Sequence, residues 1–233
     1  MSVSVVIPFF NEESNVNKLL DELIYNFNEQ KITFELILVN DNSTDNTLKK
    51  LKIFEDKYKE IKIINNIQNV GQSFSLIKGI KNACFDTIIT LDGDGQNNPK
   101  DIPKLLDAYL LHSDVFLVGG LRHNRKDNII KIVSSKVANR VRSYILKDNC
   151  KDTGCSLKVF DRNIFLQLPF FDGIHRFLPA LYKGYGKKTL FLNVDHRSRV
   201  YGKSKYGTFL RLFRGIKDLI LVVKIIKDFN KNK

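Results

Sequence analysis

Cysteine, proline and long apolar runs are all scarce in this chain of 233 residues. The three cysteines, Cys84, Cys150 and Cys155, form no C-x-x-C pair, which argues against both a disulfide framework and a zinc site. Reduced thiols in a cytosolic compartment are the expected state. With 13 glycines, 5 prolines and 43% hydrophobic residues, the composition also excludes a fibrous or disordered chain.

No apolar stretch reaches the roughly 18 residues of a membrane-spanning helix. The nearest, 216–226, is interrupted by Lys217, Asp218 and Lys224. The segment 1–8 has no basic region, and its apolar run is too short for a signal peptide. These absences predict a cytoplasmic chain without a transmembrane segment.

Several nucleotide-binding and hydrolase motifs are missing as well. No G-x-G-x-x-G follows the first predicted strand and no G-x-x-x-x-G-K-[ST] occurs, which weighs against a nicotinamide enzyme and a P-loop NTPase. The strand-to-helix elbow of serine hydrolases is also absent.

Acidic residues are few relative to basic ones, and the net charge is +13. The charge is uneven: residues 1–110 carry −4, residues 111–195 carry +8 and residues 196–233 carry +9. Such an excess indicates an anionic partner, namely nucleic acid, a phosphorylated ligand or a membrane surface. Nucleic acid is the least favoured of these, because its binders more often carry their basic residues on one face of a small module.

Short β-branched runs alternate with amphipathic helical stretches. This rhythm predicts an α/β domain with a mostly parallel, Rossmann-like sheet flanked by helices. In such sheets, ligands bind beyond the carboxyl ends of the strands. Strands are predicted at 3–7, 34–39, 61–64, 87–91, 114–118, 157–160 and 188–194, and helices at 14–28 with Ser14 as cap, from Asp45 onward, and at 71–83, 99–111 and 128–146.

Asp92, Asp94 and Gln96 follow the apolar strand predicted at 87–91. Alternate residues of an extended segment point the same way, so these three side chains can converge. Their oxygens suit a hard cation, which also relieves the repulsion between two close carboxylates. A solvated turn is the alternative, but the position at the end of a buried strand favours a site for Mg²⁺ or Mn²⁺.

Polar residues also follow two other predicted strands. Pro8–Glu12 closes the first strand, and Asp41 and Asp45 follow the second. A carboxylate at Asp41 can accept a hydrogen bond from a base or a ribose hydroxyl, whereas Asp45 is expected to cap the next helix. Gly71 precedes a helix, where its backbone N–H either faces a phosphate or forms an ordinary turn.

A basic loop with the sequence R-V-Y-G-K-S-K-Y-G spans 199–207. Its Arg, Lys and Ser side chains can bind phosphate, and an exposed flexible loop is the alternative interpretation. Arg122 and Arg125 lie just beyond the fifth predicted strand and are expected on the ligand edge of the sheet. His175 and His196 belong to no H-x-x-x-H pair and are expected to be structural or to support a ligand rather than bind metal.

Residues 209–229 follow the pattern of an amphipathic helix. A basic helix of this kind can lie in an anionic membrane interface. A terminal helix packed on the domain, with a solvated basic face, fits the pattern equally well. The apolar side holds Leu212, Phe213, Ile216, Leu219, Ile220, Val223 and Ile226, and the other side holds Arg211, Arg214, Lys217 and Lys224, with Lys227 as an exception.

Together these segments resemble the family 2 glycosyltransferases of the GT-A fold, and within them the dolichyl-phosphate mannose synthase and polyprenyl-phosphate glycosyltransferase branch. The combination of D-x-D-x-Q at a strand end with a late R-x-x-G-x-S-K is fairly specific. The matching segments, in order, are V-V-I-P-F-F-N-E-E at 5–13, V-N-D-N-S-T-D at 39–45, N-V-G-Q-S at 69–73, L-D-G-D-G-Q-N-N-P at 91–99, D-T-G-C-S-L-K at 152–158 and R-V-Y-G-K-S-K-Y-G at 199–207.

The resemblance implies a metal-dependent, inverting hexosyltransferase of cell-envelope glycan synthesis. It would move a sugar from a UDP- or GDP-linked donor to a dolichyl or undecaprenyl phosphate. It would be a peripheral protein on the inner face of the membrane, contacting it through 208–229, with no nucleic-acid partner and with a homo-oligomer left open. The expected division is a GT-A catalytic domain over 1–207, comprising a nucleotide-binding half (1–110) and an acceptor half (111–207), and a basic amphipathic helix over 208–233.

The same resemblance assigns roles to individual residues. Asp92, Asp94 and Gln96 would hold Mg²⁺ or Mn²⁺. The catalytic set would be Asp94, Arg122, Asp152, Arg199 and Lys205; the acceptor-phosphate set Arg122, Lys131, Arg199 and Ser204; and the nucleotide pocket Pro8, Asn11, Glu12, Asp41, Gly71, Asp92 and Gly93.

Three departures from the family pattern stand out. Many relatives carry hydrophobic C-terminal spans that are not found here. The basic residue on the helix after the fifth strand is often arginine in such enzymes, and Lys131 is the nearest candidate for it here. Segment 171–176 lacks the Glu-Asp pair that supplies a base in many hydroxyl-glycosylating relatives. The alternatives are transfer to a hydroxyl of a glycan or lipid, with Asp152 or Asp172 as base, and a non-catalytic nucleotide-sugar binding protein.

Overall fold

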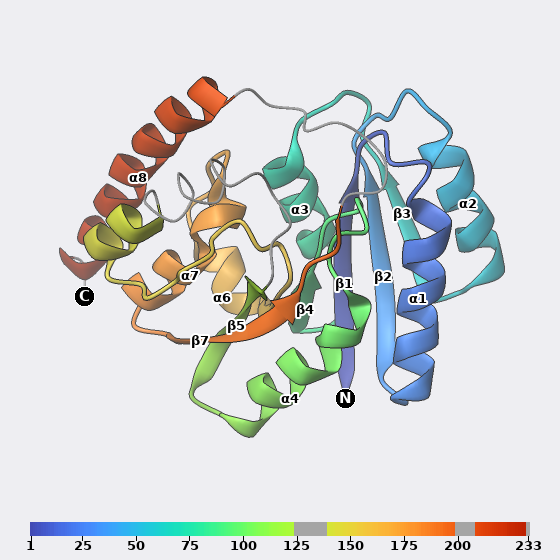
Figure 1. Cartoon of the computed structure of the whole chain (residues 1–233), viewed down its shortest axis with the longest axis horizontal. Helices are drawn as coiled ribbons and strands as arrows, with labels where there is room; N and C mark the ends of the chain where they lie inside the picture. Colours follow the sequence, from blue (N-terminus) through green and yellow to red (C-terminus); the bar gives the residue numbers. More distant parts are fainter. Residues whose placement is uncertain (124–138, 199–207, 232–233) are drawn as a thin grey trace.

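A computed structural model describes residues 1–123, 139–198 and 208–231. One seven-stranded sheet carries helices on both faces (Figure 1). The strands are β1 (Ser2–Phe9), β2 (Thr33–Asn40), β3 (Ile61–Asn65), β4 (Thr87–Thr90), β5 (Val115–His123), β6 (Lys158–Asp161) and β7 (Lys188–Asp195). The helices are α1 (Val16–Glu29), α2 (Thr47–Lys57), α3 (Gln72–Lys81), α4 (Ile102–Leu111) after the 3-10 turn η1 (Pro99–Asp101), α6 (Arg162–Gln167), α7 (Ile174–Gly184) and α8 (Thr208–Lys231).

The strand order is β3-β2-β1-β4-β6-β5-β7, and only β6 runs antiparallel to its neighbours. The carboxyl ends of the other strands therefore meet at one edge, and the start of β6 arrives at the same edge. The seven predicted strands and the mostly parallel sheet are confirmed.

Alternation along the strands divides the core into two layers. Val5 and Ile7 of β1 pack with α1, α2 and α4 on one face of the sheet. Val6 and the β2 residue Ile37 pack with α3, α6, α7 and α8 on the other. In Figure 1, α1 and α2 lie at one end of the sheet and α7 and α8 at the other.

Strand β5 continues through Gly119-Gly120 to His123, so the prediction that Arg122 lies beyond it is wrong. The glycine pair does not end the strand, because both residues remain paired with β7, and neighbouring side chains fill the space that a larger residue would need. A Cβ added at Gly120 would come within 2.8 Å of both Cys155 Sγ and Val194 Cγ2. Arg122 is therefore the second-to-last residue of β5, where it pairs with Val194 of β7.

Two helix starts differ from the sequence prediction. Asn15 rather than Ser14 precedes α1, and its side chain donates to Glu12 Oε2 at 2.8 Å instead of capping the helix. Asn46 rather than Asp45 directly precedes α2. Asp45 Oδ1 nevertheless accepts a hydrogen bond from Thr47 N at 2.9 Å, as a capping carboxylate does. Of the helix predicted at 128–146, residues 139–146 are helical and the remainder lies outside the described residues.

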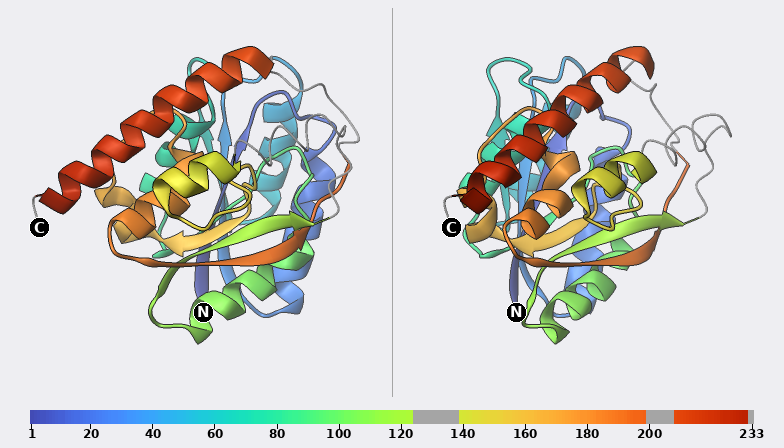
Figure 2. Two further views of the ribbon diagram at one scale, coloured as in Figure 1. Left: turned by 60° about the vertical axis from the view of Figure 1, so that its left-hand side comes forward. Right: turned by 90° about the vertical axis from the view of Figure 1, so that its left-hand side faces the viewer.

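Helix α8 packs along α7 and crosses one side of the molecule (Figure 2). At Gly184 the two helices come close, since an added Cβ would lie 2.5 Å from Ile226 Cγ1. Further along, the rings of Tyr185 and Phe229 stack with centroids 3.8 Å apart. Among the described elements, no helix is both long enough and apolar enough to cross a membrane.

A second apolar strip of α8 faces outward. Ile216 and Ile220 are 50% and 66% exposed, whereas Val222 is fully buried. Lys217 and Lys224 lie on the exposed side of the same helix. The predicted apolar side is thus divided, because α7 covers only part of it.

Candidate active site

The D-G-D-G segment leaves β4 at the carboxyl edge of the sheet and turns sharply. Gly93 lies against the Phe9 ring, where an added Cβ would come within 2.5 Å of Cδ1. Gly95 has a φ of 70°, a left-handed conformation that favours glycine. Asp94 Oδ1 accepts a hydrogen bond from Gln96 N at 3.1 Å. The two glycines allow the turn that presents the two carboxylates.

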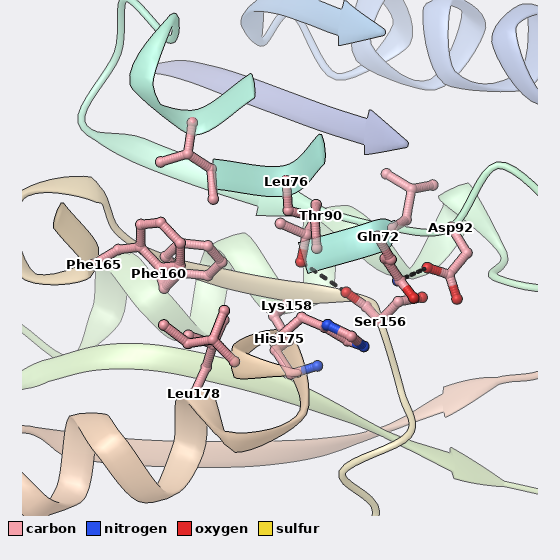
Figure 3. A pocket seen from close by; sticks show the side chains of 13 residues that line it. Gln72, Leu76, Thr90, Asp92, Ser156, Lys158, Phe160, Phe165, His175 and Leu178 are labelled. Atoms are coloured by element: carbon pink, nitrogen blue, oxygen red, sulfur yellow. Dashed lines mark hydrogen bonds between the residues drawn. The ribbon is translucent and has the colours of Figure 1, made fainter. Parts of the chain in front are cut away.

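Asp92 is partly buried at the end of β4, and its Oδ1 accepts a hydrogen bond from Gln72 Nε2 at 2.7 Å (Figure 3). Burial raises the pKa of Asp92 to about 6, and the negative charge of Asp94 adds to the rise, whereas the charges of Lys158 and Arg122 lower it. A carboxylate whose ionisation is opposed by a neighbouring negative charge lies in the kind of field that a divalent cation relieves.

This donor set fits a small divalent ion that takes few ligands from protein. Mg²⁺ is commonly held by one or two carboxylates, with substrate phosphates and water completing its shell. Across the described ranges, no group of three or more His, Cys, Asp and Glu side chains gathers into a cage. Asp92, Asp94 and the nearby Gln96 match the sparse arrangement rather than an all-protein site.

Gln96 connects this loop to the end of β7. Its Nε2 donates to Arg197 O at 3.2 Å and lies 3.3 Å from His196 Nε2. Arg197 N donates to Gln96 O at 2.9 Å, and Asn97 forms an isolated β-bridge with His196. His196 therefore contacts a predicted metal-binding residue, the supporting position expected for it.

His175 lies beside the cavity under Asp92, where polar side chains gather at the Asp92 end and Phe160, Phe165 and Leu178 at the other (Figure 3). Its Nδ1 lies 2.8 Å from Ser73 Oγ, and the same oxygen accepts from Gly173 N at 2.7 Å. Burial lowers the pKa of His175 to about 3, so the ring is neutral near pH 7. This is the structural histidine predicted.

The loops after β1 and β2 are bound to each other. The Asn11 side chain accepts from Thr44 N at 2.7 Å and donates to Thr44 Oγ1 at 3.1 Å. Glu12, only 8% exposed, donates its N–H to Thr47 Oγ1 at 2.9 Å. Pro8 precedes them within β1. The structure thus brings these predicted nucleotide-pocket residues to one edge, close to the loop that begins at Asp41.

Asp41 is buried and holds the segment that leads into α3. Its Oδ1 accepts from Asn66 Nδ2 and Val70 N, each at 2.9 Å, and its Oδ2 accepts from Gly71 N at 2.8 Å. The N–H of Gly71 is therefore directed at a carboxylate of the chain. A contact between this N–H and a phosphate, which the sequence suggested, would require that hydrogen bond to be exchanged.

Arg122 and Asp152 form a bidentate ion pair. Nε donates to Oδ2 and Nη2 donates to Oδ1, both at 2.7 Å. The two predicted catalytic residues are therefore partners of each other. Four further predicted residues, Lys131, Arg199, Ser204 and Lys205, lie outside the described residues, as does Arg125.

The sequence interpretation missed two residues next to Asp92. Gln72 orients the Asp92 carboxylate, and Lys158, only 4% exposed, places a buried positive charge at the start of β6. Lys158 Nζ donates to Cys155 O. A lysine inside the predicted apolar strand 157–160 was a readable signal, because buried lysines are rare unless they have partners.

Curated relatives and a family model match most of the chain. The model of glycosyl transferase family 2 matches residues 4–168. Dodecaprenyl-phosphate galacturonate synthase of Rhizobium johnstonii is 35% identical over 227 residues, which cover 96% of this chain and 67% of that protein. Undecaprenyl-phosphate 4-deoxy-4-formamido-L-arabinose transferase of Proteus mirabilis is 35% identical over 221 residues, covering 94% and 66%. The chain spans about two thirds of the length of these relatives.

Solved structures share the fold at low sequence identity. Glucosyl-3-phosphoglycerate synthase from Mycobacterium tuberculosis, in complex with Mn²⁺, UDP and glucosyl-3-phosphoglycerate, is 16% identical with a TM-score of 0.68, covering 95% of this chain and 78% of its own. Mannosyl-3-phosphoglycerate synthase from Rubrobacter xylanophilus is 14% identical with a TM-score of 0.72, covering 95% and 73%. These likenesses confirm the GT-A fold. With the family model and the curated relatives, they establish that the chain belongs to glycosyl transferase family 2.

Proposed function

We propose that this chain transfers a sugar, with inversion, from a nucleotide-diphosphate donor to a polyprenyl phosphate. The observation that carries the proposal is the 35% identity, over 96% of the chain, to dodecaprenyl-phosphate galacturonate synthase. The basic charge of residues 111–233 supports an anionic acceptor.

At the donor end, Asp92, Asp94 and Gln96 are proposed to hold Mg²⁺ or Mn²⁺. A divalent ion bound there would neutralise charge that develops on the departing nucleotide diphosphate. Gln72 fixes the direction of the Asp92 carboxylate through its 2.7 Å hydrogen bond. The proposed nucleotide pocket comprises Pro8, Asn11, Glu12, Asp41, Gly71, Asp92 and Gly93.

At the acceptor end, the main obstacle is electrostatic repulsion between the acceptor phosphate and the donor diphosphate, rather than the removal of a proton. A phosphate acceptor is already anionic near neutral pH, so it needs no strong general base. Two unit charges about 4 Å apart, at an effective dielectric of about 20, repel by roughly 4 kcal/mol. Arg122 is proposed to offset this, together with Lys131, Arg199 and Lys205, and the Ser204 hydroxyl is proposed to contact the acceptor phosphate.

The main alternative, transfer to a hydroxyl, requires a carboxylate base at Asp152 or Asp172. Both Asp152 oxygens accept hydrogen bonds from Arg122. Asp172 is exposed on the loop before α7. Neither arrangement resembles a base held against a reacting hydroxyl, which supports the phosphate acceptor.

We further propose that the chain is peripheral on the cytoplasmic face of a membrane and contacts it through 208–229. The outward strip of α8 supports this, because Ile216 and Ile220 are exposed beside Lys217 and Lys224. Apolar residues flanked by lysines suit an anionic interface. In the proposed division, residues 1–110 bind the nucleotide, residues 111–207 bind the acceptor and residues 208–233 form the membrane helix.

Matched acceptors test the proposal. Purified protein is incubated with UDP- and GDP-linked sugars, Mn²⁺, and either undecaprenyl phosphate or undecaprenol, which differ only in the phosphate. Transfer to the phosphate alone, lost with EDTA and in Asp94→Ala, is the expected result. Transfer to undecaprenol alone would establish the hydroxyl alternative, and sugar-nucleotide binding without transfer to either would indicate a non-catalytic binding protein.

A further inference from the structure

We infer that Asp152 is a positioning residue that fixes the Arg122 guanidinium for the acceptor phosphate, and that it is not a general base. The inference rests on the proposed function and adds a role for one residue within it. It begins from the bidentate geometry of the pair, which joins the end of β5 to the loop before β6.

The two parallel hydrogen bonds hold the guanidinium plane in the plane of the carboxylate. Both side chains are largely buried, with exposed fractions of 14% for Arg122 and 10% for Asp152. A single hydrogen bond would leave the guanidinium free to swing about it, whereas two fix its direction.

Asp152 also accepts two backbone hydrogen bonds. Arg122 N donates to its Oδ2 and Gly154 N donates to its Oδ1, both at 3.2 Å. Four donors therefore already converge on this carboxylate. A general base needs an oxygen directed at the proton that it removes, and here both oxygens are directed at Arg122 and at the backbone.

The loop that carries Asp152 is itself anchored. Arg142 donates to the fully buried Asp148 and to Cys150 O, while Cys150 N donates to Asp148 Oδ1 at 3.0 Å. Nearer Arg122, the glycine at position 154 leaves room for the guanidinium, because an added Cβ would lie 2.6 Å from Arg122 Nη2. Backbone and side chains together thus set where Arg122 points.

Arg122 is also close enough to the donor end to act on it. It stands near the carboxyl end of β5, and only β6 separates this strand from β4, which Asp92 follows. A guanidinium held in one orientation near the donor carboxylates can receive the acceptor phosphate without losing further rotational freedom, which favours a productive geometry.

A double-mutant cycle tests the inference with full-length protein, undecaprenyl phosphate and the donor that the wild type uses. Asp152→Asn, Arg122→Gln and the double variant are compared for acceptor KM, kcat and the pH profile of kcat. If Asp152 acts through Arg122, Asp152→Asn raises acceptor KM by roughly tenfold, about the effect of losing one charge-assisted hydrogen bond. It leaves the pH profile unchanged, and adds nothing further to Arg122→Gln.

Gly154→Ala provides a second route, because it displaces the guanidinium while leaving Asp152 intact. We expect the same rise in acceptor KM. The matched control is Asp114→Asn, which breaks the exposed Lys188–Asp114 ion pair just before β5 and should leave both constants unchanged. Thermal unfolding of each variant reports whether it is folded.

Different results would contradict the proposed function and the positioning role of Asp152. A wild type that does not glycosylate undecaprenyl phosphate contradicts the proposed function itself. A wild type that does, with an Asp152→Asn variant that loses kcat and its pH dependence at unchanged acceptor KM, contradicts the inference alone.

Discussion

Gln72 donates a 2.7 Å hydrogen bond to Asp92 Oδ1 and so connects the first residue of α3 to the end of β4. The next residue, Ser73, contacts Gly173 and His175 at the start of α7. One turn of α3 therefore sets both the direction of a proposed metal-binding carboxylate and the position of a helix in the proposed acceptor half.

Replacing Gln72 by alanine should weaken metal binding without unfolding the protein. Loss of a partner that orients a ligand typically weakens metal binding roughly 10- to 100-fold. Mn²⁺ titration followed by electron paramagnetic resonance measures the affinity directly. Gln68→Ala is the matched control, because Gln68 is exposed in the preceding loop. Equal Mn²⁺ affinities in the two variants would contradict the role of Gln72.

Asp92 should make metal-free stability depend on pH. Its pKa rises from 3.8 in the unfolded chain to about 6 in the folded one, so the folded state holds the proton more tightly. The stability that this group contributes is present below about pH 4 and is lost as the pH rises through about 6. Asp92→Asn removes the effect.

With EDTA present, the Tm of Asp92→Asn minus that of the wild type should therefore increase between about pH 4 and pH 6 and then level off. Saturating Mn²⁺ should reduce or reverse the difference at neutral pH, because the ion stabilises only the state that binds it. Tm curves that run parallel across this range would show that Asp92 does not titrate as described.

Gly93→Ala should destabilise the protein and disturb the donor loop. The added methyl group would lie 2.5 Å from the Phe9 ring, and overpacking of this kind costs about 1–3 kcal/mol. Urea unfolding measures the loss. Adding Phe9→Leu should restore part of it by making room. Gly215→Ala, where nothing lies within 4 Å of the added atom, should not destabilise and so serves as the control.

Substitutions on the exposed and buried sides of α8 should affect membrane binding and stability independently. Ile220→Asp, at a position 66% exposed, should reduce co-sedimentation with anionic vesicles and leave urea unfolding unchanged. Val222→Ala, at a fully buried position, should lower stability by about 2 kcal/mol and leave vesicle binding of the folded protein intact. If Ile220→Asp binds vesicles as the wild type does, this strip is not the contact.

The sheet and its ligand edge were predictable because they depend on local patterns. β-Branched runs identified all seven strands, and the strand-end positions of Asp92, Asp94 and Asp41 followed from them. The end of β5 was not predictable, since whether Gly119-Gly120 breaks a strand depends on Cys155 and Phe191 packing over it.

The sequence did not allow a prediction of which side chains, far apart along the chain, contact each other. Arg122 and Asp152 are 30 residues apart, and their types alone permitted two independent catalytic roles. Helical periodicity likewise grouped Ile220 with Ile226, but only the position of α7 decides which of them is covered. Both cases depend on tertiary contacts, which neither propensity nor spacing encodes.

The reversed direction of β6 has a consequence for how this architecture can diversify. β5 finishes, and β6 starts, at the same rim of the sheet, so the stretch joining them departs from and returns to one place. The length of that stretch is therefore not fixed by the order or the register of the strands. The side chains that this stretch brings to the rim can therefore differ in number and kind while the proposed donor-binding loop after β4 keeps its place.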